Sequence, residues 1–410
     1  MTETQPGDSA GPSDFPATTP FNPPAPAVAP RPPSTRDLRI EFTASGSEYF
    51  RIWIVNLLLT LVTLGLYYPF AKARRLRYFD ANTVIDGQAL AFHGDPWRMF
   101  RGYVLLAVLL AAYSGGGRIS PTVGLVAFVI VAAIWPALWR ASLQFRLGNT
   151  SWRGLRFRFS GGLREAYLAY LPVGIPLLPY IGISLFFSNA QRHGDVEALR
   201  SMLSLVWILG LSGLGVALLS PWTFGLLKRY QHGHYGFAAQ QTRLDLGIGP
   251  FYGLAGRIFG VTLGLGVLFG ICVIPLAALT GARGGATPGY GAIAAFGVAY
   301  ALFIAIYLSY ATSRTQNLVW GHTRSAAIAF HSRLGATELL KLTLVNWLLT
   351  LVTLSLYRPF AAVATTRLRL AAMTIEVSED VETWAGDGAL ASQDASGDAA
   401  ADFFGFDIGL

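Results

Sequence analysis

Long apolar segments separated by shorter polar stretches are the dominant pattern of this chain. A helix needs about 20 residues to cross the roughly 30 Å of hydrocarbon in a membrane. Most segments reach that length, and 102–116 is the shortest. The pattern predicts an all-α polytopic membrane protein with six to eight membrane segments in a bundle. The segments lie at about 49–70, 102–116, 119–140, 165–187, 203–227, 252–280, 290–312 and 336–361.

The first and last segments carry the same stripe of polar residues. Asn, Thr, Thr and Tyr recur at i, i+4, i+7 and i+11, which is one face of a helix whose other positions are mostly Leu or Val. Such a stripe can line a path for a solute, or it can hydrogen-bond to neighbouring helices. The repeat also indicates duplicated units in parallel orientation. The stripe residues are Asn56, Thr60, Thr63 and Tyr67 in the first copy, and Asn346, Thr350, Thr353 and Tyr357 in the second.

Between the apolar segments, short stretches alternate in polarity and end near a turn residue. This pattern predicts short cytoplasmic β-hairpin connections, with Gly87 and Gly154 at the turns. The stretches 40–42 and 374–377 resemble single, unpaired strands of such hairpins. Prolines are predicted to end three incoming helices, each thirteen residues before an Asn or His. The predicted strands lie near 90–94, 157–161, 244–247 and 328–332, and the prolines are Pro69, Pro136 and Pro221.

Basic residues gather in the longer loops, which the positive-inside rule places in the cytoplasm. If all predicted strands lie on that side, segments 49–70 and 336–361 must enter and return on the same side of the membrane. The alternative is that both segments span and both ends of the chain lie outside. The unbroken helical period from Asn56 to Tyr67 favours spanning, whereas the basic residues that follow the last segment favour return.

The composition supports the membrane class and divides the chain. Hydrophobic residues make up 53% of it and charged residues 13%, about half the share typical of a soluble domain. We expect a disordered Pro-rich tail at 1–39, a membrane domain of repeated strand–helix units at 40–377 and an acidic disordered tail at 378–410. The basic residues follow the topology of a membrane protein, so we expect no nucleic-acid partner.

Catalytic and metal-binding motifs are missing from the sequence. A nucleophile elbow, a P-loop and a zinc-protease helix are all absent. Histidines in the loops have no cysteine partner, and the lone Cys272 lies in an apolar run. We therefore expect no enzymatic activity, no cofactor and no metal site.

The basic end of the first segment is the second candidate site. Each basic residue near an anionic membrane surface contributes about 1 kcal/mol of attraction. The cluster can contact anionic head groups, or it can serve only to set topology. Its members are Lys72, Arg74, Arg75 and Arg77.

The string from Asn56 through Tyr67-Tyr-Pro69-Phe-Ala-Lys72 to Asn82-Thr83 and Gly87, with the segment 149–157, resembles the DUF898 or YjgN-like family of bacterial inner-membrane proteins. The resemblance covers most of 40–376. It implies a multi-pass protein of the inner (cytoplasmic) membrane and no known activity. Lys72 and Arg75 are replaced by Ala362 and Thr365 in the last unit, so a function of the basic end is expected in the first unit.

Two functions follow from these observations. The first is a small-solute transporter or channel that uses the polar stripes. The alternative is a non-catalytic membrane-organising or anionic-lipid-binding protein. The expected partners are membrane lipids and further copies of the chain in a homo-oligomer.

Overall fold

The computed structural model describes residues 1–2, 35–175, 178, 202–281 and 290–378. Contacts divide the chain into units Met1–Ser34 and Thr35–Leu410, and all the elements named below belong to the second. Most of the predicted Pro-rich tail lies outside the described residues, as do the acidic tail beyond 378 and most of 176–201.

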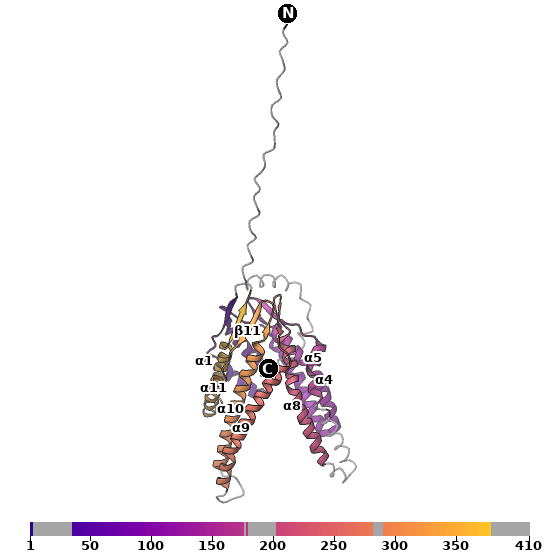
Figure 1. The fold of residues 1–410 in the computed structure, drawn as a ribbon, viewed down its shortest axis with the longest axis vertical. Helices are drawn as coiled ribbons and strands as arrows, with labels where there is room; N and C mark the ends of the chain where they lie inside the picture. The colour runs from indigo at the N-terminus through magenta and orange to yellow at the C-terminus, as the bar shows by residue number, and fades with distance from the viewer. Residues whose placement is uncertain (3–34, 176–177, 179–201, 282–289, 379–410) are drawn as a thin grey trace. The chain divides into compact units, whose positions relative to one another are not determined.

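Helices alternate with short strands along the second unit (Figure 1). The helices are α1 (Gly46–Val62), α2 (Tyr68–Ala81), α3 (Pro96–Ile119), α4 (Pro121–Gly148), α5 (Leu163–Gly174), α8 (Met202–His232), α9 (Gly249–Gly281), α10 (Tyr290–Trp320), α11 (Ala336–Val352) and α12 (Arg358–Ala371). The strands are β1 (Arg36–Phe42), β2 (Thr83–Ile85), β3 (Gln88–Ala89), β4 (Ala91–Phe92), β5 (Thr150–Trp152), β6 (Leu155–Phe159), β7 (Tyr235–Phe237), β8 (Gln240–Gln241), β9 (Arg243–Leu244), β10 (Thr323–Arg324), β11 (Ile328–Ser332) and β12 (Met373–Val377).

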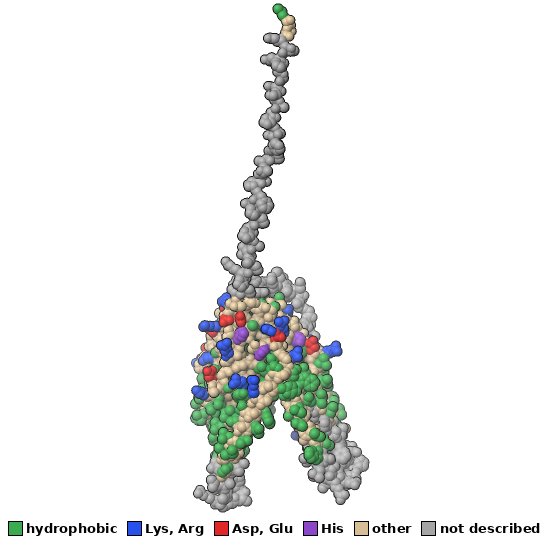
Figure 2. Space-filling view, viewed as in Figure 1, with side chains coloured by type: hydrophobic (Ala, Val, Ile, Leu, Met, Phe, Trp, Pro, Cys, Tyr) green, Lys and Arg blue, Asp and Glu red, His purple; other side chains and the backbone are tan. Residues whose placement is uncertain are grey.

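Among the described residues, five helices are long and apolar enough to cross a membrane, namely α3, α4, α8, α9 and α10. This number is below the predicted six to eight for two reasons. The first and last apolar segments each divide into two shorter helices, and the segment 165–187 is described only in part. Figure 2 shows hydrophobic side chains along the helices and charged ones over the strands. The chain is thus a mostly helical, polytopic membrane protein.

The strands follow one another in a ring, which we call the crown. Seven of them form a sheet in the order β3-β2-β1-β12-β11-β10-β9, and five form a second sheet, β4-β5-β6-β7-β8. Leu90 joins β3 to β4, and Thr242 joins β8 to β9. Antiparallel pairing of β1 with β12 closes the circuit. The interpretation of 40–42 and 374–377 as unpaired strands is therefore wrong. Residues 40–42 pair with 83–85 of β2, and 374–377 pairs with 36–39, the first part of β1, which begins before the predicted boundary at 40.

Tight turns connect neighbouring strands at the predicted glycines. Asp86 and Gly87 have φ of 50° and 75°, and Arg153 and Gly154 have φ of 51° and 82°. Two consecutive positive φ values are typical of a type I′ hairpin turn, in which the second position favours glycine. Arg153 Nη2 also forms an ion pair of 2.7 Å with Asp86 Oδ2, which joins the two sheets.

Apolar side chains fill the inside of the crown. Leu38, Val377, Trp152 and Phe237 are 2%, 1%, 5% and 7% exposed, and they belong to a single cluster. Alternate positions, such as Arg156 in β6, are exposed. Because the cluster draws on strands from both sheets, the crown encloses a packed core, as small closed barrels do.

The helices also form a ring in chain order. Each described helix packs against the next one along the chain, and α12 packs against α1. No other pair of described helices makes more than a marginal contact. Side chains three or four residues before the last residue of α2, α10 and α12 hold the loop that precedes another helix. The bonds run from Arg77 Nη2 to Gly94 O (2.9 Å), from Asn317 Nδ2 to Leu334 O (3.0 Å) and from Arg367 Nη2 to Ala44 O (2.6 Å).

The prediction that three prolines end incoming helices is wrong. Pro136 and Pro221 lie inside α4 and α8, and Pro69 lies in the first turn of α2, after α1 has ended at Val62. An internal proline lacks a donor and disturbs the hydrogen bonds of the preceding turn, but a neighbouring helix can satisfy the freed carbonyl groups. In both helices, a tyrosine of the following helix supplies a bond three residues before the proline. These bonds are Tyr167 Oη to Ala133 O (2.7 Å) and Tyr252 Oη to Leu218 O (2.8 Å).

The pairs α1–α2 and α11–α12 are helical hairpins that begin and end at the crown. β1 pairs with β2, and β11 pairs with β12, so the chain enters and leaves each hairpin through neighbouring strands. Turns at 63–67 and 353–357 separate the two helices of each hairpin. Paired strands cannot lie on opposite sides of a membrane. In the described structure, neither 49–70 nor 336–361 forms one continuous helix, and this favours the alternative in which each segment enters and returns on the same side.

Candidate functional site

The polar stripe of the first segment builds the turn between α1 and α2. Leu64 and Gly65 have φ of 50° and 93°, in the left-handed region that favours glycine. The N–H of Gly65 donates to Thr60 O at 2.7 Å, and Thr63 Oγ1 accepts from the N–H of Tyr67 at 3.0 Å. The hydroxyls of Thr60 and Thr63 donate to carbonyls one turn earlier in α1, at 2.6 and 2.7 Å.

The last segment repeats this turn. Leu354 and Ser355 have φ of 49° and 75°, with Ser355 at the position of Gly65. The N–H of Ser355 donates to Thr350 O at 2.7 Å, and Thr353 Oγ1 accepts from the N–H of Tyr357 at 3.0 Å. The hydroxyl groups of Thr60, Thr63 and Thr353 therefore have a local structural role.

The stripe asparagines face the returning helix of their own hairpin. Asn56 and Asn346 are 7% and 5% exposed. Asn56 Oδ1 accepts a long bond of 3.5 Å from Arg74 Nη1, and Asn346 Nδ2 donates to Thr365 Oγ1 at 3.3 Å. These bonds favour the helix–helix interpretation of the stripe. Asn346 Oδ1 is buried and has no hydrogen-bond partner in the described chain. A role for the stripe in lining a solute path stays a prediction.

A groove of about 580 Å³ lies between α1 and α2. Arg51 and Val55 are one turn apart on α1, and Arg74 and Arg77 are one turn apart on α2, so two basic helix faces meet across it. None of the three arginines forms an ion pair with a carboxylate in the described part of the chain. The groove is lined by Arg51, Ile52, Val55, Arg74, Arg77 and Tyr78. It therefore combines three positive charges with an apolar floor.

Nearby contacts orient the groove residues. The hydroxyl oxygen of Tyr78 lies 3.0 Å from Ser45 O and from Glu48 Oε2, which fixes its ring against the start of α1. The guanidinium of Arg74 lies 5.7 Å from the centre of the Tyr67 ring. Arg51 and Arg74 are both exposed. Their guanidinium groups are therefore accessible to a ligand.

Two of the four predicted head-group residues, Arg74 and Arg77, line the groove. Arg51, which was not predicted, lines it as well. Lys72 does not line the groove, and Arg75 lies 5.3 Å from the centre of the Phe79 ring instead. Sequence reasoning missed Arg51 because it belongs to the other helix of the hairpin. The spacing of Arg51 and Val55 could have indicated it. These residues share one helix face at i and i+4, and a returning hairpin brings that face against α2.

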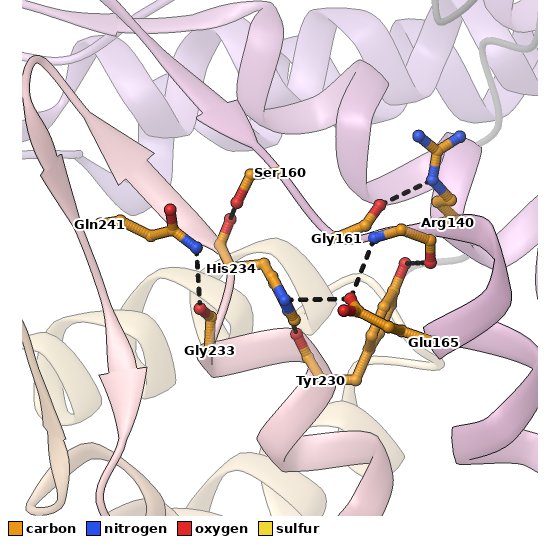
Figure 3. A network of polar contacts seen from close by, with 9 residues as sticks. Arg140, Ser160, Gly161, Glu165, Tyr230, Gly233, His234 and Gln241 are labelled. Carbon is orange, nitrogen blue, oxygen red and sulfur yellow. Dashed lines mark hydrogen bonds and ion pairs between the residues drawn. The ribbon is translucent and has the colours of Figure 1, made fainter.

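A second polar network joins α4, α5 and α8 (Figure 3). His234 Nε2 lies 3.1 Å from Glu165 Oε2, and the hydroxyl of Tyr230 donates to Gly162 O at 3.1 Å. Arg140 Nε donates to Gly161 O at 2.7 Å. Tyr230 thus repeats the bond of Tyr78 to the carbonyl group of the residue that precedes a helix, here at the start of α5. Among the described residues, no group of three or more His, Cys, Asp or Glu side chains could hold a metal ion.

A family model described as "Bacterial protein of unknown function (DUF898)" matches residues 37–403. The chain belongs to the DUF898 family. This finding confirms the resemblance carried by its sequence motifs. The DUF898 chain is 27% identical to the inner membrane protein YjgN of Salmonella typhimurium over 331 residues, which cover 78% of this chain and 83% of that protein. It is 24% identical to YjgN of Escherichia coli K12 over 237 residues, which cover 53% and 58% of the two chains. No solved structure matches the chain significantly.

The second hairpin of the DUF898 chain lacks two of the residues that line the groove. Ala364 and Leu368 occupy the positions of Arg74 and Tyr78. Arg367, at the position of Arg77, donates to Ala44 O in the loop before α1. The groove therefore belongs to the first unit, where the sequence places the function of the basic end.

Proposed function

We propose that this chain, a multi-pass protein of the bacterial inner membrane, is a non-catalytic protein that binds anionic lipid head groups at the α1–α2 groove. The observation that carries the proposal is the set of three arginines around Ile52 and Val55, which form no ion pair with a carboxylate of the described residues. A guanidinium binds phosphate oxygens through two parallel N–H bonds, and the apolar floor suits the glycerol and upper acyl region of a lipid.

The hairpin places this groove at a suitable depth. Its tip is apolar and open, with Leu64 93% exposed and Leu66 56% exposed. The second tip repeats this, with Leu354 88% exposed. From Arg51 to Val62, α1 rises about 16 Å, which is about half the hydrocarbon thickness. With the arginines at head-group level, the hairpin enters the membrane to about its midplane and returns.

Transport along the axis of the crown is less well supported. A solute on that axis would have to displace the buried cluster that contains Leu38 and Trp152. Head-group binding requires no such opening, because the groove is already accessible. In this proposal, the polar stripe stabilises the hairpin that carries the groove.

Lipid binding tests the proposal. We expect Arg51→Gln with Arg74→Gln to weaken binding of phosphatidylglycerol to the full chain in nanodiscs. Two lost charges at about 1 kcal/mol each correspond to about 30-fold. The matched control is Lys341→Gln with Arg358→Gln, which removes two exposed charges from the second hairpin. Native mass spectrometry would count the retained lipid. Equal losses in the two double variants would show that charge alone, without the groove, attracts the lipid.

A further inference from the structure

The five-stranded sheet of the crown carries only positive charge. Its strands β4 to β8 contain two charged residues, Arg156 and Arg158, which are both in β6 and both exposed. Arg153 lies in the turn before β6. The seven-stranded sheet differs, because β1 alone holds Asp37 and Glu41 beside its arginines. Positive charge without acid is therefore a feature of the β6 side of the crown.

Among the described residues, four arginines on this side share one carboxylate. Arg156 and Arg158 form no ion pair with any described residue. Asp86 accepts from Arg153 Nη2 at 2.7 Å and from Arg36 Nη2 at 2.6 Å, so one acid joins β1 to the turn before β6. We call the four arginines the basic face, namely Arg36, Arg153, Arg156 and Arg158. Four arginines against one carboxylate leave an excess of three positive charges.

The last strand of the crown ends beside the basic face. Val377, the last residue of β12, pairs with Arg36 of β1. The N–H of Ser378 donates to Ala327 O at 3.0 Å, which holds the chain at this point. The side chain of Arg36 is 66% exposed. The segment that follows Ser378 therefore starts next to an accessible guanidinium.

That segment is acidic. Residues 379–410 include eight acidic residues and no Lys, Arg or His. Nine extended residues span up to about 30 Å. Six steps around the crown separate β12 from β6, which is about 29 Å at about 4.8 Å per strand. The first nine residues, 379–387, are therefore long enough to reach Arg156 and Arg158 even along the outside of the crown. They hold four of the eight acids, Glu379, Asp380, Glu382 and Asp387.

We propose that the acidic segment 379–387 binds the basic face of the same chain, with its carboxylates on Arg156 and Arg158. A carboxylate binds a guanidinium through two parallel N–H bonds. A segment joined to its site by a short flexible connection has an effective concentration in the millimolar range, which favours binding within one chain over binding between two copies. The contact goes beyond lipid binding, since the basic face shares no residue with the α1–α2 groove.

Crosslinking of the full chain in neutral-lipid nanodiscs tests this contact. Thr383→Cys and Gln241→Cys place one thiol on the segment and one on β8, in a chain whose single cysteine is removed by Cys272→Ala. Gln241 pairs with Gly236, which pairs with Arg158, so the thiol on β8 lies two strands from the site. A bismaleimide that spans two strands, about 10 Å, should join the two thiols within one chain.

Arg156→Gln with Arg158→Gln should slow this crosslink about fivefold, because each exposed ion pair contributes a factor of about one to five. Arg156→Lys with Arg158→Lys keeps both charges and should retain most of the rate. Raising the salt from about 0.1 to about 1 M should slow the crosslink, since the Debye length falls from about 10 to about 3 Å. The matched control, Arg243→Gln with Arg333→Gln, removes two exposed charges outside the basic face and should leave the rate unchanged.

Neutralising the four acids of 379–387 alters no strand of the crown and should reproduce the fivefold loss, so the test stands even where the arginine variant does not fold. A crosslink that forms only between two chains would overturn the proposal and indicate a second copy as the occupant. Absence of the crosslink at low salt, or an equal loss in the matched control, would overturn it as well. Arg51 and Arg74 remain unchanged throughout, so failure here is distinguishable from failure of the groove.

Discussion

Ring closure depends on a contact between the last hairpin and the first loop, which Arg367 supplies. Its Nη2 donates to Ala44 O at 2.6 Å, and its Nε donates a longer bond of 3.4 Å to Phe42 O. A hydrogen bond from a charged donor contributes about 1.5–3 kcal/mol, with less for long or exposed bonds. Arg367 is exposed, so water will replace part of what is lost. With this discount, we expect Arg367→Gln to lower the free energy of unfolding by about 0.5–1.5 kcal/mol, the range of an ordinary hydrogen bond.

Two measurements would check this prediction on purified protein in detergent. The first is reversible unfolding by titration with sodium dodecyl sulfate. The second is hydrogen exchange, which should accelerate at 36–42 and 373–377 more than in β6, because those strands form the seam of the ring. Arg333→Gln is the control, since Arg333 is exposed and, within the described part of the chain, bonds only through its backbone N–H. Equal destabilisation by both variants, or uniform acceleration around the crown, would refute the role of Arg367 in closure.

Three further outcomes are expected from the structure. Leu38→Ala should destabilise the protein by about 2–5 kcal/mol through a cavity in the crown, as measured by thermal unfolding; a loss below 1 kcal/mol would contradict the packed core. Ser355→Gly should stabilise it by about 0.5–1 kcal/mol because φ at 355 is positive, whereas Gly65→Ser should have the opposite effect. Thr60→Val with Thr350→Val should leave phosphatidylglycerol binding unchanged in nanodiscs; loss of a solute flux in proteoliposomes, with folded protein retained, would instead support the path-lining prediction.

Features that depend on local sequence patterns and on charge could be predicted from the sequence. Alternation marks the strand that contains Phe157, and the type I′ turns occur at the predicted glycines Gly87 and Gly154. Only one apolar segment lies between the first two predicted strands and between the last two. This count indicated returning hairpins as one of two alternatives. Pairing of β1 with β12 was not predictable, because no local signal specifies a partner at the other end of the chain. The continuation of α4 past Pro136 likewise depends on Tyr167, which lies on a different helix.

The filled crown also limits how a solute could move through this protein. A path along the ring axis must separate the cluster of Leu38, Trp152 and Val377, whose side chains are 1% to 5% exposed. Opening would have to break strand pairs, and the seam between β1 and β12 is also held by Arg367. Lipid binding needs neither step, because the hairpin tips and the arginine groove are exposed in the closed ring. A variant that loosens the seam therefore separates the two functions: transport should depend on Arg367, whereas head-group binding at Arg51 and Arg74 should not.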